Sequence, residues 1–488
     1  MDRQHISRRT AGFLASSLMV CLAAATSLVP VGPTAQAVAD GTGRPAPAIS
    51  PRAGARPNIL LITTDDMALE DLRHMPITRR LLGNRGVTFD NFIAPHPMCC
   101  PSRAQILTGE YAQNNGVHHN EGPWGGYQAL IHPNNTLAAW LSAAGYKTAL
   151  VGKFLNHWKP GSDGRPAGWT HLEVLMTPFQ PYGFAVWRNG VAEHPAGHTS
   201  DYVAHRTVDL INRFSRQRRP FFIWASQVAP HMMWGKHAMV PPIPPPRHRG
   251  LFASAVAPSL VKASFREADV SDKPAYVRDS TENLTEDGIN EWYRRRMQSL
   301  QAVDEGVASA VTALRRRGEL DNTVIAFTSD NGYLLGEHRL VKKNYPYEEA
   351  LRVPFLMRGP GLPPGRRVTG PAQMIDVAAT FASLAGATPR RAQDGESLLG
   401  LVKGTSPLRN AELIQAGTEE APWWWRGVRT SRYTYVHYET DGFVELYDRE
   451  RDPLQLQNVA GQPDYAGVEV ALRAELQRLQ DCSGASCR

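Results

Sequence analysis

The chain has 488 residues, 42% of them hydrophobic and 20% charged, with a formal net charge of +7. This length exceeds the usual size of one compact domain, and the composition excludes a wholly disordered protein. The basic balance favours an anionic substrate, but the charge is too weak and too spread for a nucleic-acid-binding protein. Two arginine triplets, 294–296 and 315–317, fall in one helical stretch, where we expect them to form a solvated face.

Residues 1–37 have the pattern of a cleaved export signal. Arg8-Arg9 precedes an apolar run, and Ala35-Gln36-Ala37 fits the small-residue cleavage rule. Serines and threonines interrupt the run and prolines follow it, which argues against a stable membrane anchor. The arginine pair is similar to a twin-arginine signal. We therefore predict a linker over 38–56 and an exported or secreted mature protein.

From Pro57 onward, apolar runs alternate with amphipathic segments, a pattern typical of an α/β fold with a mostly parallel sheet. Continuous apolar runs predict strands buried on both faces of the sheet, at 58–64, 148–151, 221–225 and 323–327. Polar or charged residues follow each run. Because ligand sites of open α/β sheets form at the carboxyl ends of the strands, we expect these residues to converge. Scattered loop charges are the alternative.

A helix is predicted over 288–317, where apolar residues recur at helical spacing. The preceding segment begins with the proline-rich 241–246 and continues for about forty residues of little periodicity, which predicts a functional loop over the site.

Beyond residue 405 the pattern changes. Segments 427–438 and 443–448 alternate like half-exposed antiparallel strands, and a helix over about 465–479 follows. These elements predict a small α+β subdomain over 405–480.

Five cysteines are present, and Cys21 falls in the predicted signal peptide. Cys482 and Cys487 can close a small disulfide loop in the tail, 481–488, in an oxidising compartment. Cys99 and Cys100 are adjacent, and a disulfide framework does not account for them.

Asp65 and Asp66 follow the first predicted strand, and Asp330 and Asn331 follow the last. Such oxygen ligands suit calcium or magnesium, whereas zinc or copper would favour His and Cys. Three carboxylates gathered without a cation would repel one another. Each pair could instead cap a turn, and residue types alone leave both interpretations open.

The segment Cys99-Cys100-Pro101-Ser102-Arg103 is followed by Thr108-Gly109. Proline suits a first helical turn, so we expect Cys99 just before a helix N-terminus, where backbone N–H groups favour an anion. Arg103, one turn on, adds a cation that can bind an oxyanion through two N–H groups. A thiol pair in a tight turn and an inert buried cysteine are the alternatives.

This segment resembles the signal at which the formylglycine-dependent (type I) sulfatase family converts the first cysteine to formylglycine (3-oxoalanine). The resemblance runs from Asn58 to about residue 460 and includes 329–333, 347–349, 352–354 and 358–361. Three further segments are similar to the N-acetylglucosamine-6-sulfatase branch: 152–156, 246–252 and 294–298. The family implies a catalytic domain over 57–400 with a large mixed, mostly parallel sheet flanked by helices, as in alkaline phosphatase. It also implies a smaller C-terminal α+β subdomain with an antiparallel sheet.

The resemblance further implies a sulfuric ester hydrolase with one divalent cation, calcium rather than magnesium. The implied metal ligands are Asp65, Asp66, Asp330, Asn331 and the modified Cys99. One hydroxyl of the hydrated aldehyde, a gem-diol, would attack sulfur, and the other would then expel sulfate. Arg103, Lys153 and Lys343 would stabilise charge on the sulfuryl oxygens, and His231 would donate a proton to the leaving oxygen. A formylglycine-generating enzyme is the implied partner during maturation.

Two positions depart from the family pattern. Leu155 stands where many members have His, and Asn156 or His157 would take its place, as Asn does in the glucosamine-6-sulfatase branch. Glu110 stands where the family usually has Arg or Lys. In the family that basic residue supports the modified side chain, so the resemblance implies that this support is lost here.

The expected substrate is a sulfated small molecule or glycan, with 6-sulfated N-acetylglucosamine first. Aromatic and polar side chains could stack on its ring or could pack in the core: His118, His119, Asn120, Trp124 and Trp423-Trp424-Trp425. A phosphate mono- or diester hydrolase is one alternative. A non-catalytic sulfated-glycan-binding protein, with Cys99 unconverted, is another.

Overall fold

The computed structural model describes residues 56–282 and 285–488. The predicted signal peptide lies outside the described residues, as does all but the last residue of the predicted linker. Among the residues described, no helix is long and apolar enough to cross a membrane.

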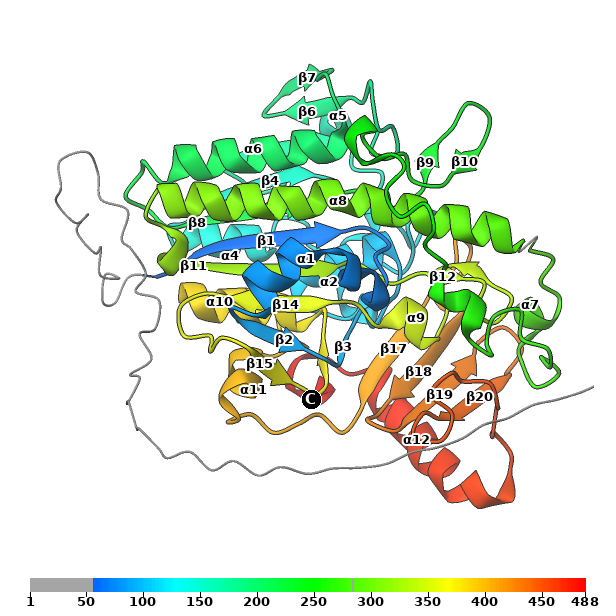
Figure 1. Cartoon of the computed structure of the whole chain (residues 1–488). Coiled ribbons are helices and arrows are strands. Elements are labelled where there is room, and N and C mark those ends of the chain that lie inside the picture. The colour runs from blue at the N-terminus through cyan, green and yellow to red at the C-terminus, as the bar shows by residue number, and fades with distance from the viewer. Residues whose placement is uncertain (1–55, 283–284) are drawn as a thin grey trace, which may run out of the picture. The chain divides into compact units, whose positions relative to one another are not determined.

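A ten-stranded mixed sheet forms the centre of the fold (Figure 1). Its order is β15 (Arg366–Val368), β2 (Val87–Phe89), β14 (Phe355–Arg358), β11 (Thr323–Ser329), β1 (Asn58–Thr64), β8 (Phe221–Ser226), β4 (Lys147–Gly152), β5 (His171–Leu175), β6 (Val186–Arg188) and β7 (Val191–Glu193). The strands from β11 to β5 run parallel, whereas β14, β6 and β7 join antiparallel to their neighbours. The four predicted strands are therefore adjacent, and the expected mixed, mostly parallel sheet is confirmed.

Helices cover both faces of this sheet. Alternate residues of β1 enter opposite cores: Ile59 and Leu61 pack on one side, Leu60 and Ile62 on the other. The first core is completed by α2 (Cys99–Thr108), α4 (Leu137–Ala143) and α10 (Asp376–Ala385). The second is completed by α6 (Thr199–Phe214) and α8 (Glu286–Arg316), which run side by side (Figure 1). Burial on both faces explains why the strands read as continuous apolar runs.

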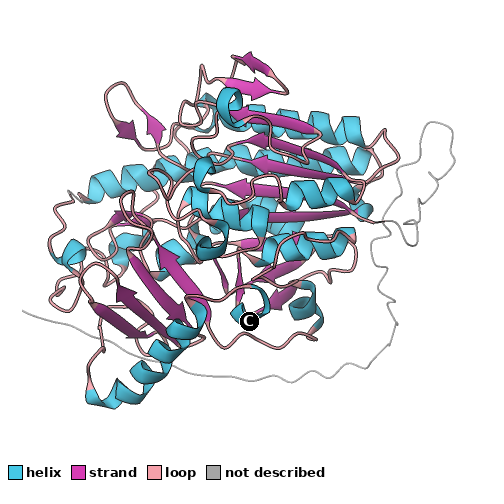
Figure 2. Cartoon of the chain, turned by 180° about the vertical axis from the view of Figure 1, so that it is seen from behind, coloured by secondary structure: helices cyan, strands magenta, loops and turns pink. Residues whose placement is uncertain are grey.

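A separate antiparallel sheet lies near the C-terminus (Figure 2). Its strands are β17 (Glu412–Ala416), β18 (Trp425–Arg429), β19 (Tyr433–Tyr438) and β20 (Val444–Asp448), and α12 (Ala466–Leu479) packs on it. The predicted strand 427–438 is thus two strands, separated by a turn that begins at Thr430. The Thr430 N–H donates to the Tyr433 carbonyl and closes this turn. Cys482 and Cys487 form a disulfide.

The remaining elements are short. Two-stranded ladders join β3 (Phe92–Ile93) to β16 (Ala372–Gln373), β9 (Met233–Trp234) to β10 (Met239–Val240), and β12 (Leu334–Leu335) to β13 (Val341–Lys342). The short helices are α1 (Pro76–Thr78), α3 (Ala112–Asn115), α5 (Pro160–Asp163), α7 (Ala275–Arg278), α9 (Glu348–Leu351) and α11 (Leu399–Lys403).

The segment expected to be a loop over the site is more ordered than predicted. It contains α7 and two single turns of 3-10 helix, Pro246–His248 and Pro258–Val261. Lys262 fixes it through ion pairs with three glutamates: Glu70, Glu337 and Glu349.

Candidate active site

Polar side chains converge where the parallel strands end. Asp65 and Asp66 follow β1, and Asp330 and Asn331 follow the neighbouring β11. Lys153 follows β4, whose last residue, Gly152, has a φ of 115°. A Cβ there would lie 1.8 Å from the Ser226 carbonyl oxygen of β8, so only glycine permits this close approach.

The nucleophile candidate begins a helix. Cys99 is the first residue of α2, one position inside the helix rather than just before it as expected, and Met98 is the N-cap. The Cys100 N–H donates to Asn120 Oδ1 (2.8 Å), so Asn120 holds the first turn of α2 through its side chain. Both cysteine side chains are buried, and their thiols are free.

Four possible metal ligands meet at one point. One atom from each of Asp65, Asp66, Cys99 and His231 lies within 4.8 Å of the others. Asn331 Nδ2 donates to Asp66 Oδ1 (2.7 Å), and Asp330 Oδ1 accepts the Asp66 N–H (3.2 Å). Asp66 Oδ2 and Asn331 Oδ1 are buried acceptors without a hydrogen-bond donor. Clustered carboxylates and unpaired oxygens fit a hard divalent cation.

Two lysines lie against the same carboxylates. Lys153 Nζ pairs with Asp65, and Lys343 Nζ pairs with Asp66 and lies 2.8 Å from Cys99 Sγ. Cys99 Sγ is 3.3 Å from Asp65 Oδ1. Carboxylates and ammonium groups therefore both lie beside the Cys99 thiol. Such a site can bind a cation through the carboxylates and stabilise an anion through the ammonium groups.

Arg103, which is completely buried, links three strands to α2. Its Nε donates to Asp330 Oδ2 (2.8 Å), and its Nη1 donates to Ser226 Oγ (2.6 Å) and to the Lys153 carbonyl (2.9 Å). Ser226 was not predicted as a site residue, because it is the last residue of an apolar strand and no motif marks it.

The charges of the cluster affect one another. Burial and the charge of Asp65 raise the pKa of Asp330 to about 6, although Arg103 opposes this shift. Burial would also raise the pKa of Asp65, but Lys153, His231 and Arg103 hold it well below its usual value. Burial and Asp65 raise the pKa of Cys99 to about 12. The unmodified thiol is therefore a poor nucleophile at neutral pH.

His231 follows β8 and faces the cluster. Its Nε2 lies 3.5 Å from Asp66 Oδ2, and its Nδ1 lies 2.7 Å from the Met232 carbonyl, to which a neutral ring donates. Burial lowers its pKa to about 4, against the opposing charges of Asp66 and Asp65. The neutral imidazole thus presents the lone pair of Nε2 to the site.

Asn156 lies in the wall of an adjacent cavity. This cavity has a volume of about 500 Å³ and is lined partly by Lys153, Asn156 and His157. Asn156 Oδ1 is buried without a donor. The hairpin β9–β10 contributes Trp234 to the lining, whereas none of the described residues of the segment 241–287, expected over the site, lines it.

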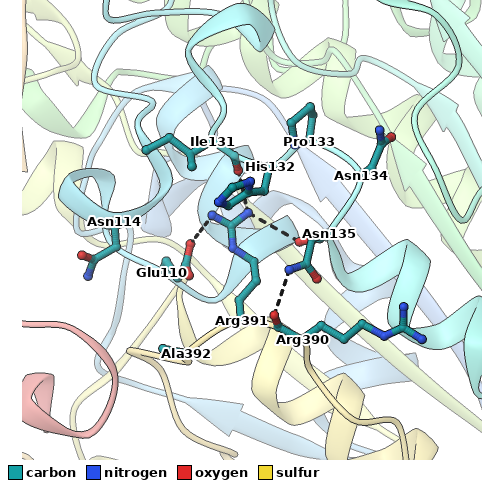
Figure 3. A pocket seen from close by; sticks show the side chains of 10 residues that line it. All are labelled: Glu110, Asn114, Ile131, His132, Pro133, Asn134, Asn135, Arg390, Arg391 and Ala392. Atoms are coloured by element: carbon teal, nitrogen blue, oxygen red, sulfur yellow. Dashed lines mark hydrogen bonds and ion pairs between the residues drawn. The ribbon is translucent and has the colours of Figure 1, made fainter.

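Glu110, which stands where the family usually has Arg or Lys, lies away from the Cys99 side chain. It follows Gly109, the C-cap of α2, and therefore lies beyond the opposite end of the helix. There it pairs with Arg391 (2.7 Å) in the wall of a second cavity, of about 760 Å³ (Figure 3).

One member of the first arginine triplet does not lie on a solvated face, which corrects the expectation for that residue. Arg296 is 1% exposed, and its Nη2 donates to the Asp66 carbonyl (2.5 Å) and to Asp71 Oδ2 (2.6 Å). It therefore fixes the turn that carries Asp66. Helical spacing could have identified it, because Arg296 lies four residues from both Trp292 and Leu300 on the apolar stripe.

The tryptophan triplet mostly packs inside the protein. Trp425 is fully buried, Trp424 packs on Tyr276 with ring centroids 4.8 Å apart, and Trp423 packs on His118 at 4.2 Å. The core interpretation therefore holds for Trp425.

Comparison with known proteins agrees with this geometry. The sulfatase family pattern matches residues 57–387. The chain belongs to the sulfatase family. A second pattern, N-sulphoglucosamine sulphohydrolase C-terminal, matches residues 336–482. The resemblance inferred from the sequence is thus confirmed, and so is the alkaline-phosphatase-like fold; the chain is a sulfuric ester hydrolase.

Individual relatives of this sulfatase extend over most of its length. An arylsulfatase of Volvox carteri is 32% identical, with 88% of this chain and 76% of the relative covered. The N-acetylglucosamine-6-sulfatase of Homo sapiens is 30% identical, with 89% and 86% covered. A solved protein in complex with its substrate D-glucosamine-2-N,6-O-disulfate has a TM-score of 0.73 at 25% identity, with 87% and 98% covered.

Proposed function

We propose that this sulfatase cleaves the S–O bond of a sulfated sugar, with Cys99 converted to formylglycine and one divalent cation, calcium rather than magnesium. The observation that carries the proposal is the position of Cys99 Sγ, 3.3 Å from Asp65 and 2.8 Å from Lys343 at the start of a buried helix. An anion held there meets backbone N–H groups and two cationic side chains at once.

Asp65, Asp66, Asp330 and Asn331 would hold the cation together with the modified Cys99. When bound, the cation supplies Lewis acidity and neutralises negative charge on the sulfuryl group. Carboxylates and an amide supplied directly by the protein suit calcium, which takes many oxygen ligands in flexible geometry, whereas magnesium usually keeps several waters. When formed and hydrated, formylglycine supplies a hydroxyl nucleophile and can then expel sulfate, which a serine ester would do slowly.

Arg103, Lys153 and Lys343 would stabilise the charge that develops on the sulfuryl oxygens. Lys153 and Lys343 are buried and already paired with Asp65 and Asp66, so their charges are preorganised in a site of low dielectric. Arg103 Nη1 donates to the backbone carbonyl of Lys153, so Arg103 also fixes the position of Lys153.

His231 would protonate the leaving oxygen. Its ring is neutral in the described site, and an anionic sulfuryl group beside Nε2 would raise its pKa, because opposite charge favours the protonated form. Asn156, with a buried unpaired acceptor, would orient the hydroxyl groups of the reacting centre or the sugar.

We take 6-sulfated N-acetylglucosamine as the first candidate substrate. The 30% identity to N-acetylglucosamine-6-sulfatase over 89% of the chain supports this choice. We also propose export through the signal in residues 1–37 and conversion of Cys99 by a formylglycine-generating enzyme during maturation.

A substrate panel tests the proposal. Protein produced together with the converting enzyme should release sulfate from 6-sulfated N-acetylglucosamine and from an aryl sulfate, and much more slowly from choline sulfate. An aryl phosphate turned over faster than the aryl sulfate would favour the phosphate ester hydrolase instead. Binding of the sulfated sugar without sulfate release, in protein that carries the aldehyde, would favour a non-catalytic binding protein.

A further inference from the structure

The cavity of about 500 Å³ shares a wall with the catalytic cluster. Phe179 forms that wall: its ring stacks on His231 with centroids 4.4 Å apart and planes at 16°, and Lys153 Nζ lies 5.1 Å from the ring centre. A group seated beside His231 therefore continues directly into this cavity. Its volume falls within the range of about 300–1,000 Å³ typical of ligand sites.

The hairpin β9–β10 presents an exposed indole to this cavity. The backbone N–H of Trp234 donates to the Phe179 carbonyl (2.9 Å), and Trp234 pairs with Met239 across the hairpin. The neighbouring Met233 is 1% exposed, whereas Trp234 is 56% exposed. The backbone of Trp234 is thus fixed on both sides, while more than half of the residue is exposed to solvent. Trp234 lines the cavity, and aromatic side chains in the lining are typical of ligand sites.

Polar groups complete the lining. Asn156 Oδ1 is a buried acceptor without a donor. Glu121 and His157 lie 3.9 Å apart, and their side chains are 56% and 48% exposed. The cavity therefore combines flat aromatic surface with hydrogen-bond acceptors. A sugar ring is complementary to both, because its apolar C–H face can pack on an aromatic ring and its hydroxyl groups can donate to the acceptors.

We propose that this cavity binds the sugar rings of a sulfated oligosaccharide, and that Trp234 stacks on one of them. Trp234 then determines specificity: it favours sulfate carried on a glycan over sulfate on a small aryl or alkyl alcohol. This inference rests on the proposed function, since it assumes that the sulfate ester is held at Cys99. It assigns Trp234 to binding, not to bond cleavage.

The test compares Trp234→Ala and Trp234→Phe with the unchanged protein on two substrates, a sulfated oligosaccharide and a small aryl sulfate. Trp234→Ala should raise the KM for the oligosaccharide about tenfold, as expected for a lost aromatic stacking contact, with kcat retained. Trp234→Phe should restore most of the affinity. The kcat/KM for the aryl sulfate should stay within about twofold, because the small substrate does not reach the indole.

Trp124→Ala is the comparison variant, since Trp124 is also exposed, at 42%, but does not line the cavity. An oligosaccharide KM unchanged in Trp234→Ala, or an equal loss on both substrates, would overturn the inference. A KM that rises in Trp124→Ala instead would place the glycan elsewhere and would also overturn it. If the unchanged protein hydrolysed no sulfate ester at all, the proposed function would fail, which is a separate result.

Discussion

Replacing Lys153 by methionine separates its structural role from its catalytic role. Lys153 is 3% exposed, its ammonium pairs with Asp65, and its carbonyl accepts from Arg103. Methionine keeps the length and apolar stem of the side chain but removes the charge. Asp65 then keeps its ion pair with Arg103, whose Nη2 lies 3.6 Å from Asp65 Oδ2.

Removing one partner of a buried ion pair typically costs about 3–5 kcal/mol of folding free energy. We expect a loss in this range for Lys153→Met when unfolding in urea is followed with a chelator present, and a smaller loss with calcium, which would compensate Asp65. Loss of one charge-stabilising group should also lower kcat by about 10²–10³ at temperatures where the variant is folded.

Lys273→Met is the matched control. Lys273 is fully buried and pairs with Glu267 (3.3 Å) and Asp272 (3.2 Å), away from the catalytic cluster. We expect a similar loss of stability and a kcat within about twofold of the unchanged protein. The reasoning is refuted if Lys153→Met loses stability but keeps its kcat, or if Lys273→Met loses as much activity as Lys153→Met.

Three further predictions follow from the described contacts. Chelation of divalent cations should abolish sulfate release and lower the melting temperature, because the clustered carboxylates repel one another without a cation. Calcium should restore both properties better than magnesium. Full activity in chelated, metal-free protein would contradict this prediction. Burial raises the pKa of Glu110 from 4.5 to about 7 despite Arg391, so the folded state binds the proton more tightly, and stability should fall by about 3 kcal/mol as pH rises from 4.5 to 7. Glu110→Gln should flatten that part of the curve of unfolding free energy against pH, and an unchanged slope would disprove the assignment. Arg296→Lys should raise the calcium concentration needed for half-maximal activity about tenfold, because Arg296 fixes the turn of Asp66; an unchanged calcium requirement would show that the turn holds without it.

The catalytic half of the fold was largely predictable because its strands are buried on both faces. Runs such as 58–64 and 323–327 therefore stand out as continuous apolar segments, and the side chains after them gather at one edge. The short antiparallel strands β2 and β14 were not predicted, because three or four residues carry too little periodicity.

The site was predictable where a local motif marks it and not where distant segments meet. Cys99 and Arg103 share one helix, so their spacing alone relates them. Phe179 and Trp234 are far apart in the sequence and are joined by a backbone hydrogen bond, which no local pattern encodes. Arg296 was misinterpreted because a run of arginines usually marks a solvated surface, whereas one of its three members lies on the buried stripe of α8.

The most direct test measures the chemical state of residue 99 together with the rate of sulfate release. Mass spectrometry of the peptide that contains this position should show the aldehyde in protein made with the converting enzyme, and specific activity should rise in proportion to the aldehyde fraction. Cys99→Ala should be folded and inactive. Full activity in Cys99→Ala, or in protein whose residue 99 is entirely thiol, would contradict the account.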